Sequence, residues 1–226
     1  CVPQIHGASR NAWLHVRETI EIELNSVTDN PIVLNEKEII SGGGFHGQPI
    51  AMALDYATLA AAELGNVSDR RCYLMLEGEK YNLPSFLLTD SGLNSGFMIP
   101  QYTAASIVSQ NKQLCMPASV DTIDSSNGQE DHVSMGTIAA RKANQILQNA
   151  QNVIAMEMLS ATQAIDLLRP LKSSPTIEAI HQHIRKTVPF AKEDRVFAKD
   201  IEAIKMLMLD GSLKKILLSQ VGDLQC

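Results

Sequence analysis

Aromatic residues are scarce in this chain, and it has neither a long apolar run nor a block of like charge. Phe, Trp and Tyr make up 4% of the 226 residues, whereas Ala, Leu, Ile, Gln and Met are abundant, which favours helix over strand. No apolar stretch approaches the roughly 18 residues needed to span a bilayer, and no secretion signal is visible. We therefore expect no membrane association and a cytoplasmic location.

Charge and cysteine content exclude further classes of protein. The net charge is -6 with no clustered Lys or Arg, so nucleic-acid binding is not predicted. The four cysteines, at positions 1, 72, 115 and 226, lack the CxxC spacing of structural zinc sites and fit a reducing compartment. His181 and His183 would point to different faces of a helix. No metal site is predicted.

Helical periodicity dominates what is present. We predict helices over residues 11–26, 49–76, 101–114, 130–168, 175–187, 199–209 and 212–220, with a short β-hairpin near residues 31–40. At 1.5 Å per residue the helix over 130–168 would be roughly 60 Å long, with an apolar stripe along it. Such a helix predicts a mainly α long-helix bundle shared between subunits. With no repeat or linker visible, residues 1–226 are predicted to form a single unit.

Three consecutive titratable side chains, Glu130, Asp131 and His132, stand at the predicted start of this helix. One interpretation is structural: Asn127 caps the helix, Glu130 reaches back as in a capping box, and His132 is a buried hydrogen-bonding residue. The other is functional. The positive end of a helix dipole favours an ionised carboxylate, which suits Glu130 to act as a base or to hold a cationic amine.

Two loops are further candidates. Residues 41–47 place three glycines before Phe45, either as a tight turn with Phe45 in the core or as a segment that presents an aromatic ring to a planar substrate. The spacing is not that of a nucleotide-binding loop, because no GxGxxG occurs. Residues 28–31, which include Asn30, have the composition of an ordinary turn.

Together these segments resemble the histidine ammonia-lyase family, also called the aromatic amino acid lyases. The matching motifs are NSVTDNP at 25–31, SGGGFH at 41–46, GLNSGFM at 92–98, PASVD at 117–121, QEDHVSM at 129–135 and AARK at 139–142. They occur in the order found in the family, and the resemblance extends over nearly the whole chain. It corresponds to the C-terminal half of such an enzyme.

The resemblance implies a helical homotetramer whose active sites are built from three subunits. It implies deamination of L-histidine to trans-urocanate and ammonia, a reaction of histidine catabolism. The electrophile would be a methylidene-imidazolone (MIO) ring formed from an internal Ala-Ser-Gly. No Ala-Ser-Gly occurs in this chain. We therefore expect the N-terminal, electrophile-bearing part to lie outside it and the chain to be inactive alone.

Site roles follow from the same resemblance. Glu130 would be the catalytic carboxylate, and Phe45 would line the pocket beside the electrophile. Asn30, Gln129 and His132 would bind or position the substrate. Two alternatives stay open: a tyrosine or phenylalanine lyase or aminomutase with the same ring, and a non-catalytic assembly subunit.

Overall fold

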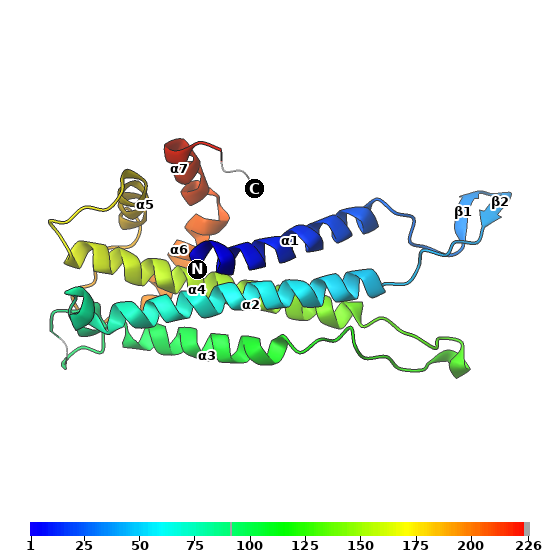
Figure 1. Ribbon diagram of the computed structural model, residues 1–226, viewed down its shortest axis with the longest axis horizontal. Coiled ribbons are helices and arrows are strands. Elements are labelled where there is room, and N and C mark those ends of the chain that lie inside the picture. Colours follow the sequence, from blue (N-terminus) through cyan, green and yellow to red (C-terminus); the bar gives the residue numbers. More distant parts are fainter. Residues whose placement is uncertain (91, 224–226) are drawn as a thin grey trace. The chain divides into compact units, whose positions relative to one another are not determined.

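The structure is a computed structural model that describes residues 1–90 and 92–223. Its α-helices are α1 (Val2–Leu24), α2 (Gln48–Leu76), α3 (Met98–Leu114), α4 (Gly136–Leu167), α5 (Pro175–Arg185), α6 (Phe197–Leu209) and α7 (Ser212–Val221). Strands β1 (Ile32–Asn35) and β2 (Glu38–Ile40) form an antiparallel hairpin. The predicted mainly α fold with one short hairpin is confirmed (Figure 1). None of the described helices combines the length and apolar character needed to cross a membrane.

Residue contacts divide the chain into two compact units. Unit 1 comprises Cys1–Leu64 and Gln110–Gln148, and unit 2 comprises Gly65–Ser109 and the chain from Asn149 onward. The boundaries fall inside α2, α3 and α4. Each of these helices therefore contributes one segment to each unit.

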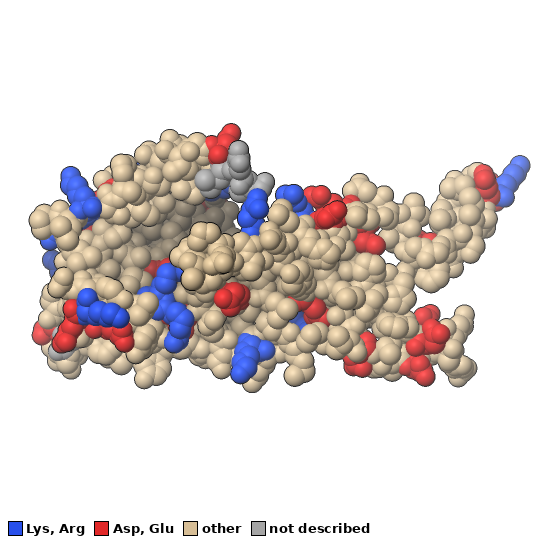
Figure 2. Space-filling model, viewed as in Figure 1, with Lys and Arg blue, Asp and Glu red and all other residues tan. Residues whose placement is uncertain are grey.

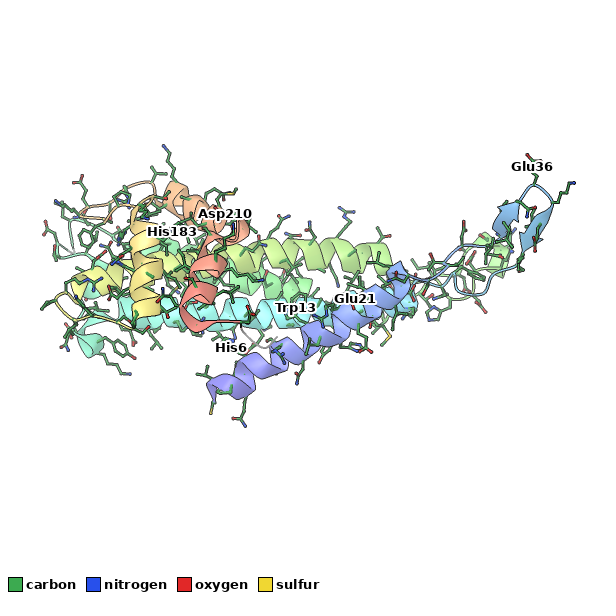
Figure 3. The ribbon with its side chains drawn as sticks, turned by 90° about the horizontal axis from the view of Figure 1, so that it is seen from above. His6, Trp13, Glu21, Glu36, His183 and Asp210 are labelled. Carbon is green, nitrogen blue, oxygen red and sulfur yellow. The ribbon has the colours of Figure 1, made fainter. Side chains whose placement is uncertain are left out.

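Unit 1 contains α1, the hairpin and the long loop between α3 and α4 (Figure 1). In the hairpin Ile32 pairs with Ile40 and Val33 with Ile39, and the register shifts before Asn35. Val33, Ile39 and Ile40 are exposed. Figure 3 shows Trp13 and Glu21 along α1 and Glu36 at the tip of the hairpin.

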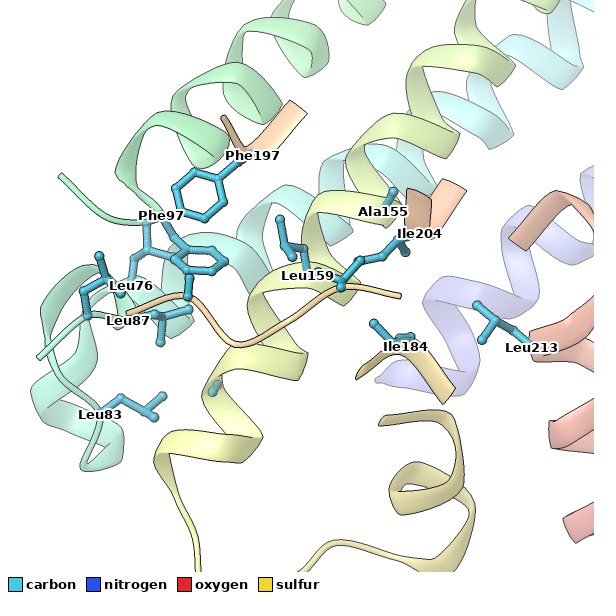
Figure 4. Packing of buried hydrophobic residues seen from close by; sticks show 14 residues of the cluster. Leu76, Leu83, Leu87, Phe97, Ala155, Leu159, Ile184, Phe197, Ile204 and Leu213 are labelled. Atoms are coloured by element: carbon cyan, nitrogen blue, oxygen red, sulfur yellow. The ribbon is translucent and has the colours of Figure 1, made fainter. Parts of the chain in front are cut away.

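Unit 2 is held by a core of large apolar side chains (Figure 4). The rings of Phe97 and Phe197 pack with their centroids 4.8 Å apart. Leu159 of α4 and Ile184 of α5 belong to the same cluster and are almost fully buried. Burial of such side chains is the main source of folding free energy, so this unit carries its own stabilising core.

The two histidines of α5 contact different elements. His181 Nε2 lies 2.9 Å from Asp166 Oδ1 of α4, whereas His183 Nε2 lies 3.2 Å from Ser212 Oγ at the start of α7. Asp210 accepts the backbone N–H of Ser212 at 2.8 Å, and this bond holds the pKa of Asp210 below its usual value. His183 and Asp210 are labelled in Figure 3.

The start of α4 was predicted wrongly. The helix begins at Gly136, six residues after Glu130. The backbone reverses instead at Ser126, Asn127 and Gly128, which have φ angles of 53°, 59° and 81°. Left-handed backbone cannot continue an α-helix, and Gly128 tolerates it because it has no Cβ. Asn127 is therefore not the cap of α4.

Candidate active site

All five predicted site residues lie in unit 1, on two segments that meet. The first segment, residues 25–47, carries Asn30 and Phe45, and the second, residues 119–135, carries Gln129, Glu130 and His132. His46 Nε2 lies 2.8 Å from the backbone oxygen of His132, and the two imidazole rings are 5.2 Å apart. Residues far apart in sequence are thereby brought together.

Asn30 organises the glycine-rich loop. Its Oδ1 accepts the backbone N–H of Gly42 at 2.9 Å and the hydroxyl of Ser41 at 3.3 Å. A Cβ added to Gly42 would lie 2.6 Å from the backbone oxygen of Asp29, so no larger residue fits there without movement. The glycine is required here by close approach of two backbone segments rather than by an unusual φ.

An open cavity of about 580 Å³ lies beside this loop. Phe45 lines it and is 58% exposed, so its ring is not a core side chain as one interpretation had it. Glu23 of α1 and Ser134 also line it, together with Ile20, Leu24, Thr28, Gly47, Ile50, Leu54, Gly136 and Thr137. Asn30, Gln129, Glu130 and His132 are not part of this lining. The cavity is mostly apolar, with a few polar groups at its edge, as small-molecule sites are.

Glu130 lies in the loop and not at a helix terminus. Its backbone N–H and C=O pair with the C=O and N–H of Ser125 at 3.3 and 3.2 Å, which closes the turn at 126–129. Gln129, Glu130, Asp131 and His132 are exposed. The expected effects of a capping box and of the α4 dipole on Glu130 are therefore absent.

The loop is nevertheless strongly acidic. Residues 119–134 include Asp121, Asp124, Glu130 and Asp131 and no Lys or Arg. Figure 2 shows acidic side chains gathered over the loop that follows α3. Four carboxylates without a local counter-charge create a negative potential that attracts cations such as a primary ammonium group.

The start of the loop is anchored to α2 and α4 by a buried carboxylate. Asp55 Oδ2 accepts the backbone N–H of Ser119 at 2.7 Å, and its Oδ1 lies 3.1 Å from Lys142 Nζ. Gln48 Nε2 donates to the backbone oxygen of Ser119 at 2.8 Å. Burial opposes ionisation of Asp55, but the bonds from Ser119 and Lys142 outweigh it and lower the pKa of this carboxyl. Asp55 is therefore an anion that fixes the loop.

Sequence reasoning missed the roles of Asp55, Lys142 and His46. Asp55 is one of three acidic residues in the alanine-rich α2, with Glu63 and Asp69, so the local sequence does not single it out as half of a buried ion pair. Its partner Lys142 lies in a different helix and cannot be found from local spacing. In the described ranges, no group of three or more His, Cys, Asp or Glu side chains is placed to hold a metal ion.

Comparison with known proteins decides the family. A family model described as aromatic amino acid lyase matches residues 1–186. The chain belongs to this family. It is 49% identical to the histidine ammonia-lyase of Natranaerobius thermophilus over all of its length and 45% of that protein. The corresponding enzyme of Symbiobacterium thermophilum gives the same identity and coverage.

Solved structures of aromatic amino acid lyases share the fold. Histidine ammonia-lyase from Trypanosoma cruzi is 44% identical with a TM-score of 0.91, over 97% of this chain and 44% of that one. Tyrosine aminomutase from Streptomyces globisporus is 38% identical with a TM-score of 0.89, over 99% of this chain and 43% of that one. The chain spans less than half the length of these relatives and matches the C-terminal half of the curated ones.

Proposed function

We propose that this chain is the C-terminal part of an ammonia-lyase that converts L-histidine to trans-urocanate and ammonia. The observation that carries the proposal is the 49% identity, over the entire chain, to proteins named histidine ammonia-lyase. The geometry is consistent with it, because an acidic loop contacts the segment that places an exposed aromatic ring beside a cavity.

The reaction breaks the Cα–N bond and removes a proton from Cβ, giving a double bond and ammonia. Glu130 would accept a hydrogen bond from the substrate ammonium or imidazole and take part in the proton transfer. Gln129 and His132, next to it in the loop, would orient the substrate through polar contacts. Asn30 would act by holding the loop that carries Phe45. The surrounding carboxylates of residues 121–131 favour binding of a cationic amine.

A MIO ring would supply the electrophile that activates the substrate for elimination. The tripeptide that would form it does not occur in this chain, so it would come from polypeptide outside these residues. What the chain offers is Phe45, whose exposed ring at the cavity provides an apolar surface for a planar group. Without the electrophile, the carboxylate of Glu130 faces a weakly acidic Cβ proton, so the chain alone would not turn over.

The exposed surface of unit 1 supports the proposed oligomer. Ile22, Leu24, Val33 and Ile39 are large apolar side chains that water reaches in this chain. An isolated two-stranded hairpin is marginally stable in water, and exposed apolar patches mark interaction surfaces. We infer that other polypeptide covers them in a cytoplasmic homotetramer.

An aminomutase is the second candidate, favoured by the match to tyrosine aminomutase. The two reactions share the removal of ammonia and differ in whether the amine is returned at Cβ. Product analysis of the full-length protein with L-histidine, L-tyrosine and L-phenylalanine separates them. Urocanate from histidine supports the proposal. A β-amino acid, or a cinnamate-type product without urocanate, would overturn it.

A further inference from the structure

Both ring nitrogens of His46 are engaged. Nδ1 faces the backbone N–H of Gln48 at 3.2 Å, and Nε2 faces the backbone oxygen of His132 at 2.8 Å. A backbone N–H can only donate, and a carbonyl oxygen can only accept. The ring must therefore accept at Nδ1 and donate at Nε2, which is the neutral Nε2–H tautomer.

His46 lies where the two segments of the candidate site, residues 25–47 and 119–135, meet. Its neighbours Phe45 and Gly47 both line the cavity. Its partner His132 lies two residues after Glu130 and two before Ser134, which lines the cavity as well. A Cβ added to Gly47 would lie 2.9 Å from Ser134 Oγ, so the segments are in close contact at this point.

We propose that His46 is a positioning residue that holds the Glu130 segment against the Phe45 segment through the Nε2–H bond to His132. This inference rests on the proposed function, since it concerns the placement of Glu130 in the lyase site. Thr122 closes the loop on itself by accepting the backbone N–H of Val133 at 2.8 Å. The His46 bond joins this closed loop to the start of α2. The reaction rate falls by a large factor when a catalytic group is displaced by about 1 Å. The hydrogen bond from His46 to His132 should therefore matter for turnover.

A purely local role is the competing explanation. The bond from Gln48 to Nδ1 belongs to the entry into α2, and His46 could serve only that turn. The two roles use different nitrogens and can be separated by two amide substitutions. The longer amide of His46→Gln would reach as far as Nε2 and could donate to His132. The shorter amide of His46→Asn would reach only as far as Nδ1 and could accept from Gln48.

The test compares His46→Gln, His46→Asn and His46→Ala in the full-length protein. We expect His46→Gln to keep near-normal kcat, and the other two to lose roughly ten- to a hundredfold in kcat with much smaller changes in KM. Hydrogen–deuterium exchange of residues 120–134, without substrate, should rise in the Asn and Ala variants alone. Normal kcat in the Asn variant, or equal loss in the Gln and Asn variants, would overturn the proposal.

Failure of the proposed function gives a different result. If the unmodified full-length protein releases no ammonia from histidine, tyrosine or phenylalanine, the lyase assignment fails. The exchange measurement then still decides whether the His46 bond holds the loop, because it needs no substrate. Exchange that is equally slow in all three variants would show that the bond does not hold it.

Discussion

Unit 2 buries leucine, isoleucine and phenylalanine, whereas the buried apolar residues of unit 1 are all alanines except Val16 and Ile146. Alanine allows close helix packing but contributes little apolar area. Unit 1 adds a buried ion pair at Asp55 and a network of hydrogen bonds to loop backbone. The predicted site residues all belong to unit 1. The stable scaffold and the site-bearing surface are thus different parts of this molecule.

The largest effect is expected from the unit 2 core. Leu159→Ala should lower the free energy of unfolding by about 3 to 5 kcal/mol, because it removes a fully buried side chain and leaves a cavity. Leu59→Ala, the same change at a half-exposed position of unit 1, should cost less than about 1 kcal/mol. Urea unfolding of the chain measures both. An equal loss of unfolding free energy in the two variants would contradict the distinction between a core of large side chains in unit 2 and a weakly packed unit 1.

Glu130→Gln should reduce turnover of the full-length protein roughly a hundred- to a thousandfold, or about 3 to 4 kcal/mol. The amide keeps the size of the side chain but can neither accept a proton nor pair with an ammonium. Because Glu130 is exposed, the unfolding curve should not move. Glu36→Gln removes one exposed carboxylate at the tip of the hairpin, outside this loop, and serves as the control. Near-normal turnover at saturating histidine in the Glu130 variant would contradict its catalytic role.

Lys142→Met tests how far unit 1 depends on its buried charges. The substitution leaves the carboxylate of Asp55, whose side chain is only 6% exposed, without its cation. It should lower the free energy of unfolding by about 2 to 3 kcal/mol. Arg17→Met removes a cation from the exposed pair with Glu21 in the same unit and should cost less than about 0.5 kcal/mol. Similar costs for the two variants, measured by urea unfolding, would show that the buried pair does not stabilise unit 1.

The smallest effect is a pH dependence in unit 2. Hydrogen bonds from Arg169 and from the backbone N–H of Ser173 lower the pKa of Glu178 to about 2. The pKa is depressed in the folded state, so the stabilisation is complete above the ordinary value of 4.5 and is lost as the pH falls toward 2. Glu178→Gln should reduce the dependence of the free energy of unfolding on pH between 4.5 and about 2. Glu202→Gln, at an exposed and loosely paired carboxylate, should leave it unchanged.

Local patterns located all the helices because their signals are local, but the start of α1 was predicted wrongly: it begins at Val2, nine residues before the predicted start at residue 11. The predicted starts of α2, α5, α6 and α7 lie within two residues of those in the structure, and the hairpin is at the predicted place. The error at α4 has a physical cause. Apolar residues recur at helical spacing only from Ile138 onward, and residues 126–128 favour a turn, so the pattern over 130–135 never supported a helix.

The site was less predictable because its geometry is tertiary. Sequence motifs identified both segments, and the structure brings them together at His46 and His132. Local spacing gave no indication that His46 joins them or that Lys142 pairs with Asp55, since each contact joins distant parts of the chain. The roles of Glu130, Gln129, His132, Asn30 and Phe45 in binding and catalysis stay predictions.

The central claim is that other polypeptide completes the site-bearing surface of unit 1. Its most direct test is hydrogen–deuterium exchange of this chain alone and within the full-length protein, with buried segments of unit 2 as the internal reference. We expect equal protection of α5 and of the unit 2 part of α4 in both. We also expect α1, the hairpin and residues 119–134 to exchange fast in the chain alone and slowly in the full-length protein. Equal exchange of unit 1 in both would contradict the claim.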